Sequence, residues 1–311
     1  EEAKAAAFRA KWEELIDSGK LGYMALLRNL RNIQEAGVSY AHFQKVCATL
    51  ADAEQVAKAK QFPFRYLAAY REVATDGSAT PVKTLGQKLG AMLFGNKGYT
   101  GELLDALEKA VQASAANIKG FGYDTRVLLA CDVSGSMAQR ISAKSKVANY
   151  DIGLMLAMLL QSRCNNVQVG IFGDSWKTIA VPRSNVLAGV QELYKRANEV
   201  GYSTNGYLVI RDLLERKVQM DKVMLFTDCQ LWDSKATGTQ HIGFYWSRYK
   251  AKVAPRAKLY LFDLAGYGQA PLRLLENDVY LVAGWSDKVF DVLAALENGG
   301  SALDAINTIV I

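Results

Sequence analysis

The chain has 311 residues, of which 50% are hydrophobic and 22% are charged, with 25 Gly, 5 Pro and 4 Cys. This composition excludes a disordered chain, a collagen-like chain and a small disulfide-rich domain, and the length predicts two domains or one large one. The longest nearly uninterrupted apolar run, residues 152–160, has about half the length of a bilayer-spanning helix, so we expect no membrane segment. The net charge of +6 permits binding to nucleic acid without demonstrating it.

The sequence begins with Glu1 rather than Met and carries no basic-then-apolar leader, so we expect the natural start to lie upstream and predict no secretory signal. The cysteines show no CxxC spacing, and most lie in or beside apolar segments. Free thiols in such segments pack as small hydrophobic side chains. We therefore expect a reducing, cytoplasmic compartment.

Up to about residue 120, the apolar residues recur at helical spacing. Helical structure over residues 21–33 is predicted by the three-residue steps of Leu21, Met24, Leu27, Leu30 and Ile33. Further helices are expected over residues 40–50, 54–59, 64–74, 85–93 and 101–114. This part shows no convincing strand, which leaves stacked helical repeats or an irregular bundle as the alternatives.

After residue 120 the pattern changes to short apolar runs, which are typical of parallel strands buried on both faces. These runs cover residues 126–131, 167–172, 223–226, 259–262 and 279–282. Helical patterns alternate with them over residues 147–161, 186–197, 206–217 and 289–297. Strands that alternate with helices predict a doubly wound α/β sheet. We therefore expect a helical domain over residues 1–120 and an α/β domain over residues 121–311.

Oxygen-bearing side chains follow the ends of two of these strands. Asp132, Ser134 and Ser136 come directly after the first strand, and Asp228 follows the strand over 223–226. Between them, Thr204 lies in a loop ahead of a helix. Ligands of doubly wound sheets bind at the carboxyl ends of the strands, and hard oxygen donors suit Mg²⁺, Mn²⁺ or Ca²⁺. The two serines could instead cap the next helix, but the three loops in this order favour a metal site.

The set resembles the metal-ion-dependent adhesion site of von Willebrand factor A domains. The resemblance implies hydroxyl ligands from Ser134, Ser136 and Thr204, with Asp132 and Asp228 holding the cation directly or through water. The family more often has Gly-Gly-Thr where this chain reads Gly-Tyr-Ser-Thr over residues 201–204, so Ser203 is an alternative ligand. Domains of this family are generally binding modules, and an acidic group of a partner often completes the coordination.

Residues 19–33 (GKLGYMALLRNLRNI) and 61–70 (QFPFRYLAAY) resemble motifs of the TROVE module, which occurs in Ro proteins and in telomerase- and vault-associated proteins. In that family HEAT-like helical repeats precede an A domain. In Ro proteins a longer set of repeats closes into a ring with that domain, and a Lys/Leu/Arg/His motif linked to Y RNA binding lies upstream. This chain has no counterpart of the motif. The resemblance implies a Ro-like protein that binds noncoding or misfolded RNA and connects it to an RNA-processing partner.

Three groups of basic residues are candidates for contacts with RNA phosphates. Arg28 and Arg31 share a helical face, although Arg31 could instead pair with Glu35. Arg140, Lys144 and Lys146 follow the proposed metal loop. The third group lies in residues 234–261, which contain six Lys and Arg residues and no Asp or Glu, and its candidates for RNA contacts are Lys250, Lys252, Arg256 and Lys258.

Aromatic residues are interleaved with the third basic group. Tyr245, Trp246 and Tyr249 could stack on bases, or they could anchor a surface helix to the sheet. The sequence does not separate the two alternatives. His42 and His241 show no spacing that suggests a catalytic triad.

We expect a non-catalytic RNA-binding protein of the Ro type with a divalent cation, most simply Mg²⁺, in the A domain. The alternative is a metal-dependent adaptor that binds a partner's carboxylate, with RNA binding incidental. A metal-dependent phosphotransferase or nuclease ranks third, because it would need a carboxylate cluster and a positioned base rather than a site rich in hydroxyls.

Overall fold

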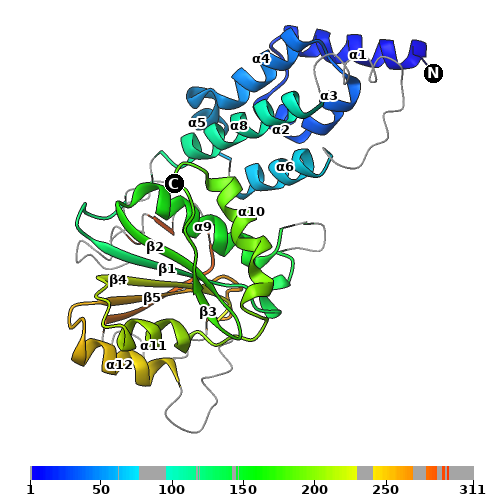
Figure 1. The fold of residues 1–311 in the computed structure, drawn as a ribbon. Helices are drawn as coiled ribbons and strands as arrows, with labels where there is room; N and C mark the ends of the chain where they lie inside the picture. Colours follow the sequence, from blue (N-terminus) through cyan, green and yellow to red (C-terminus); the bar gives the residue numbers. More distant parts are fainter. Residues whose placement is uncertain are drawn as a thin grey trace. The chain divides into compact units, whose positions relative to one another are not determined.

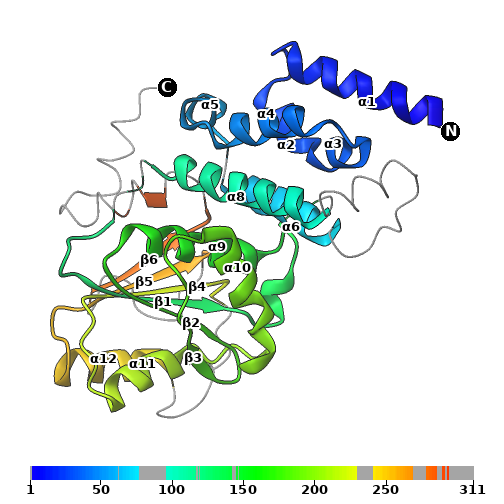
Figure 2. The ribbon, with the colours of Figure 1, turned by 45° about the horizontal axis from the view of Figure 1, so that its top comes forward.

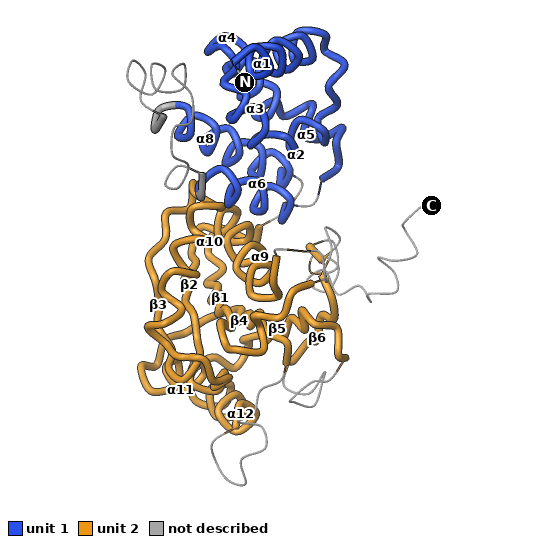
Figure 3. Tube along the Cα trace, turned by 90° about the vertical axis from the view of Figure 1, so that its right-hand side faces the viewer, with its two compact units in different colours: residues 1–117 blue, residues 118–311 orange. Residues whose placement is uncertain are grey.

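The computed structural model describes residues 2–61, 63–76, 96–116, 118, 120–141, 145, 147–229, 241–268, 278–285, 289–290 and 293. The chain divides into two compact units, residues 1–117 and 118–311 (Figure 3). Among the described residues, no helix has both the length and the apolar character needed to cross a membrane.

The first unit is helical throughout its described part (Figure 1). Its helices are α1 (Glu2–Asp17), α2 (Tyr23–Arg28), α3 (Leu30–Ala36), α4 (Tyr40–Ala51), α5 (Ala53–Ala59), α6 (Pro63–Asp76) and α8 (Asn96–Ser114). The helices predicted over 40–50, 54–59, 64–74 and 101–114 are confirmed by α4, α5, α6 and α8. The helix predicted over 85–93 lies outside the described residues.

The helical structure predicted over residues 21–33 is present, but as two helices rather than one. Asn29 has φ −109° and ψ 13°, which ends α2 and begins α3. Its side-chain amide donates a 2.8 Å hydrogen bond to the carbonyl of Ala25, and asparagine competes in this way with regular helical bonding. Leu27, Leu30 and Ile33 are nevertheless all buried, so the apolar stripe survives the break.

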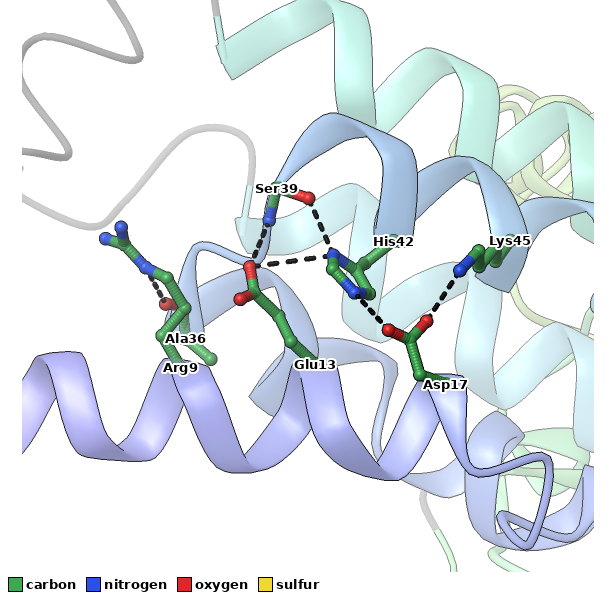
Figure 4. Close-up of polar contacts among 7 residues, drawn as sticks. All are labelled: Arg9, Glu13, Asp17, Ala36, Ser39, His42 and Lys45. Atoms are coloured by element: carbon green, nitrogen blue, oxygen red, sulfur yellow. Dashed lines mark hydrogen bonds and ion pairs between the residues drawn. The ribbon is translucent and has the colours of Figure 1, made fainter.

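Helix α1 was not predicted, although Phe8, Trp12, Leu15 and Ile16 recur at helical spacing, and none of its described residues is buried. Polar contacts fasten it to α3 and α4 (Figure 4). The backbone N–H of Ser39 donates to Glu13 Oε1 at 2.8 Å, and Lys45 donates to Asp17 Oδ1 at 2.6 Å. His42 lies within hydrogen-bond distance of both Ser39 Oγ (2.6 Å) and Asp17 Oδ2 (3.1 Å). These contacts compensate for the modest apolar burial of α1.

The second unit contains a six-stranded sheet in the order β3-β2-β1-β4-β5-β6 (Figure 2). Its strands are β1 (Arg126–Asp132), β2 (Asn166–Phe172), β3 (Trp176–Thr178), β4 (Lys222–Thr227), β5 (Lys258–Asp263) and β6 (Val279–Ala283). The five predicted strands are present and mutually parallel. Strand β3 was missed, since it has three residues and pairs antiparallel with β2 at the edge of the sheet.

Helices cover both faces of the sheet. Helices α9 (Asn149–Arg163) and α10 (Val186–Lys195) cover one face, and α11 (Tyr207–Glu215) and α12 (Ile242–Lys252) cover the other (Figures 1 and 2). Every residue from Ile152 to Leu160 is buried, so the longest apolar run of the sequence forms a core helix. Helix α12 fits the alternative in which Tyr245, Trp246 and Tyr249 anchor a surface helix to the sheet. Of the helix expected over 289–297, only residues 289, 290 and 293 are described, and these are helical.

The chain order creates a switch point at the centre of the sheet. Strand β1 lies between β2 and β4. The chain runs from β1 to β2 and β3 on one side, and then crosses to β4 on the other side of β1. The parallel register pairs Asp132 with Phe172 and Thr227 with Asp263, which brings the carboxyl ends of these strands to one edge. Ligands of doubly wound sheets bind in this position.

Candidate metal centre

The loop after β1 brings three of the predicted ligands together. Asp132 and Ser134 are buried, with exposed fractions of 1% and 2%. The backbone N–H of Ser134 donates to Asp132 Oδ1 at 2.9 Å, which turns the loop back over the strand end. Ser136 begins a short 3₁₀ turn, and its hydroxyl lies 3.3 Å from that of Ser134.

The loop over residues 201–205 places its two candidate hydroxyls differently. Thr204 is buried, whereas Ser203 is exposed. Asp174 accepts a 3.2 Å hydrogen bond from the backbone N–H of Ser203, and a further bond from the Ser203 side chain is the main cause of the lowered pKa of Asp174. Ser203 is therefore engaged by Asp174, which favours Thr204 over Ser203 as the ligand.

The same loop is held against the loop after β1. The backbone N–H of Gly135 donates to the carbonyl of Tyr202 at 3.0 Å. Gly173 and Gly201 allow a close approach of two backbones, because a Cβ on Gly173 would lie 2.1 Å from the Gly201 carbonyl oxygen. Gly201 also has φ +77°, a conformation that L side chains adopt rarely. The position of Thr204 thus depends on these two glycines.

The end of β4 contributes the remaining carboxylate. Asp228 is buried, with 2% of its surface exposed. The preceding residue, Thr227, donates a 2.7 Å hydrogen bond from its hydroxyl to Asp132 Oδ2 and accepts one from the backbone N–H of Cys229 at 3.2 Å. The sequence pattern places Thr227 with Asp228 at the end of a strand, but it does not predict the bond from Thr227 to Asp132.

Burial dominates the electrostatics of this centre. It raises the pKa of Asp132 to about 7, the negative charge of Asp228 acts in the same direction, and hydrogen bonds from Ser134 and Thr227 oppose the shift. A cation beside two buried carboxylates would offset the cost of holding them ionised. Two carboxylates and three hydroxyls are hard oxygen donors, so the residues present fit Mg²⁺ better than zinc.

Other acidic and metal-binding groups fit a cation less well. In the part of the chain that the structure describes, no three His, Cys, Asp or Glu side chains could together hold a metal, so a cation at this position would need the hydroxyl groups as ligands. Asp263 is a buried carboxylate at the end of β5 that was not among the predicted metal ligands. Its two oxygens accept hydrogen bonds from the backbone N–H groups of Gly266 (3.0 Å) and Gly268 (2.6 Å), which stabilise its own loop.

The first two basic groups differ in their contacts. Arg31 donates to Glu35 Oε1 at 3.0 Å and lies 3.8 Å from Glu72, so the pairing considered for it is present. Arg28 is exposed, and no ion pair of Arg28 is found among the described residues. Arg140 is exposed too. Lys144 and Lys146 lie outside the described residues.

The sequence alone suggested that the basic residues of the third group lack acidic partners. The structure shows that they differ in this respect. Lys250 donates to the carbonyl of Ala257 at 3.0 Å and forms an ion pair with Asp278, which lies outside the stretch without acidic residues. Lys258 lies 5.8 Å from the ring centroid of Tyr280. Lys252 and Arg256 are exposed. Only these last two are thus presented to solvent as the prediction required.

The interleaved aromatics mostly anchor α12 to the sheet. Trp246 and Tyr249 are buried in the core, and the hydroxyl of Tyr249 donates to the carbonyl of Val218 at 2.9 Å. Tyr245 is half-buried and stacks on Tyr207 of α11 at a centroid distance of 5.7 Å. Trp246 and Tyr249 are therefore unavailable for stacking on bases.

Comparison with known proteins agrees with this architecture. Residues 3–88 match the TROVE domain family, and residues 126–296 match the Ro60 vWA domain family. Telomerase protein component 1 from Mus musculus is 47% identical over 62 residues, and its Rattus norvegicus counterpart is 49% identical over 59 residues. These alignments cover 20% and 19% of this chain but 2% of each relative, so the chain spans a small fraction of their length.

The crystal structure of the Deinococcus radiodurans Ro (RSR) protein is similar in fold, with a TM-score of 0.56 and 21% sequence identity. The match covers 89% of this chain and 53% of that protein. The expected fold class, a helical part followed by a doubly wound A-type domain, is thereby confirmed. With the Ro60 vWA match extending over more than half of its length and a TROVE match ahead of it, this chain belongs to the Ro family.

Proposed function

We propose that this chain is a non-catalytic RNA-binding protein of the Ro type. Its ligands are small noncoding or misfolded RNAs with single-stranded ends, which it presents to an RNA-processing protein. The observation that carries the proposal is the combination of a TROVE domain and a Ro60 vWA domain in one chain. A cytoplasmic location stays a prediction from the sequence.

The A domain in this proposal holds Mg²⁺ through Asp132, Ser134, Ser136, Thr204 and Asp228. Bound there, the cation would supply an open coordination position for an acidic oxygen. Thr227 orients the Asp132 carboxylate, and the bond between Gly135 and Tyr202 holds the two hydroxyl-bearing loops together. Because hydroxyls outnumber carboxylates in this set, the site is suited to recognition rather than to activating a nucleophile.

A second candidate function is a metal-dependent adaptor that binds an acidic group of a protein partner. The observation that favours it is Tyr202, whose side chain is 62% exposed although its carbonyl is fixed beside the metal loop. Aromatic residues are enriched at protein interfaces, and the backbone of Tyr202 lies against the loop that would hold the cation. RNA binding would then be incidental.

The decisive experiment is to sequence the RNA that co-purifies with the full chain and to compare it with a mock purification. We expect enrichment of structured noncoding RNA. An Asp132→Ala chain purified in parallel separates the two functions, because the adaptor should lose protein partners while RNA recovery is unchanged. No RNA enrichment with either chain would overturn the proposal and favour the adaptor.

A further inference from the structure

A pocket of about 370 Å³ opens within the helical unit, between α2, α3 and α6. This volume falls at the lower end of the range of roughly 300–1,000 Å³ found for small-molecule sites. Its lining combines apolar and polar side chains. The apolar set, which we call the floor, is Met24, Leu27, Leu30, Ala68 and Ala69, and the polar set, which we call the rim, is Arg28, Arg31, Asn32, Arg65 and Glu72.

The rim has a net positive charge. Arg31 is balanced by Glu35 and Glu72, which lie 3.0 and 3.8 Å from its guanidinium nitrogens. Arg28 and Arg65 form no ion pair within the described residues, and Arg28 is exposed. Two guanidinium groups without acidic partners at one opening form a site for an anion, and arginine is well suited to phosphate because its planar fork can donate two parallel hydrogen bonds.

The floor adds a requirement that a free phosphate would not meet. Leu27 and Leu30 are 4% and 3% exposed, and both line the pocket. The two alanines of α6 leave the space open, because larger side chains at these positions would fill it. A matching ligand therefore has an apolar, flat portion as well as an anionic group, and a nucleotide has both.

We infer that this pocket binds one nucleotide of single-stranded RNA, with Arg28 and Arg65 contacting the phosphate and the base lying on the apolar floor. The inference rests on the proposed function and adds a site to it. A base within a duplex is stacked and paired, and so cannot enter a pocket, whereas unstacked bases of loops and ends can. The pocket thereby selects single-stranded segments.

The test measures binding of a short, unstructured fluorescent RNA to the full chain by anisotropy at several salt concentrations. Arg28→Gln combined with Arg65→Gln should weaken binding roughly tenfold or more, the loss expected for hydrogen bonds to charged groups. The slope of log affinity against log salt should fall by about 0.7 for each phosphate that is no longer neutralised. The matched control removes two positive charges from the same unit outside the pocket, Lys4→Gln with Lys20→Gln, and should change both quantities little.

A second variant leaves the charge unchanged. Ala68→Phe fills the floor but retains every arginine, so it should also weaken RNA binding, and circular dichroism checks that the helices persist. Adenosine 5′-monophosphate and inorganic phosphate serve as competitors, and only the nucleotide should displace the RNA.

The outcomes separate this inference from the proposed function. RNA binding that is intact in both pocket variants, or weakened only as much as in the lysine control, would show that the pocket is not the RNA site while RNA binding itself stands. Competition by inorganic phosphate equal to that by the nucleotide would also overturn the inference. No RNA binding by the unaltered chain would refute the proposed function, and the pocket with it.

Discussion

The hydroxyl of Thr227 donates a 2.7 Å hydrogen bond to Oδ2 of Asp132, a residue 95 positions earlier in the chain. Both residues are buried, and they lie at the ends of adjacent parallel strands. The bond fixes the carboxylate from one side, while the N–H of Ser134 fixes it from the other. Asp132 is thus held in one orientation before any ligand arrives.

Replacing Thr227 with Val should therefore weaken Mg²⁺ binding without removing a proposed ligand. A hydrogen bond to a charged group contributes about 1.5–3 kcal/mol, so we expect the dissociation constant to rise roughly tenfold or more. Titration calorimetry of the full chain measures this change. Thr227→Ser keeps the hydroxyl and should bind Mg²⁺ normally. Equal affinity in the Val variant would show that Thr227 does not position Asp132.

The choice between Thr204 and Ser203 as ligand can be tested through thermal stability. A cation that binds only the folded state raises Tm, and the rise grows with the logarithm of its concentration above the dissociation constant. We expect Mg²⁺ to stabilise the unaltered chain and Ser203→Ala, but not Thr204→Val or Asp132→Ala, because Ser203 is exposed and bonded to Asp174. Loss of the response in Ser203→Ala alone would transfer the ligand role by one residue. A full response in Asp132→Ala would remove the site altogether.

The buried parts of the fold were the most predictable from the sequence. Strands β1, β4 and β5 and helix α9 contain continuous apolar runs that are buried, whereas β2 and β6 are buried only in part. Strand β3 could not be predicted, because Trp176–Thr178 is short, partly polar and defined by its pairing with β2. The break at Asn29 was missed for a similar reason, since the apolar spacing continues across it.

The candidate site was predictable only as far as local motifs allow. Asp132, Ser134 and Ser136 lie in one loop, so their proximity follows from their spacing. The bond from Thr227 to Asp132 depends on the register of two strands distant in sequence. The ion pair between Lys250 and Asp278 likewise joins α12 to the residue before β6. Such long-range partners change which charges are available, and no local pattern encodes them.

The ion pair of Arg126 and Asp221 predicts a specific acid sensitivity. The Arg126 guanidinium and backbone N–H both bond to Asp221 and lower its pKa. The pKa of Asp221 in the folded chain lies below its value of about 3.9 in the unfolded chain. The ionised carboxylate therefore stabilises the fold fully above about pH 4, and this stabilisation is lost as the pH falls through the folded-state pKa. The two side chains are 39% and 42% exposed, so we expect no more than about 1 kcal/mol.

Acid-induced unfolding of Asp221→Asn measures this contribution. The variant should be less stable near neutral pH, and its free energy of unfolding should fall less steeply than that of the unaltered chain below about pH 4. Arg126→Met should reproduce most of the effect, and the double variant should lose less than the sum of the two single losses. Identical acid profiles for all four proteins would show that the ion pair does not contribute.

The third basic group provides the last test, because its members differ in their partners. Lys252 and Arg256 are exposed on α12 and the turn that follows, whereas the side chain of Lys250 is 12% exposed and bonds to Asp278 and the carbonyl of Ala257. If this surface contacts RNA, Lys252→Gln combined with Arg256→Gln should weaken binding and lower the salt slope by about 0.7 for each phosphate left without its cation.

Lys250→Gln should instead lower the free energy of unfolding by about 1–3 kcal/mol, because it leaves a part-buried acceptor without its donor. Anisotropy with a short RNA and urea unfolding, applied to all three chains, measure the two effects separately. The assignment of RNA contacts to Lys252 and Arg256 and of a structural role to Lys250 would be contradicted if RNA affinity fell only in Lys250→Gln and its stability were intact. Unchanged affinity in every variant would show that this surface does not bind RNA.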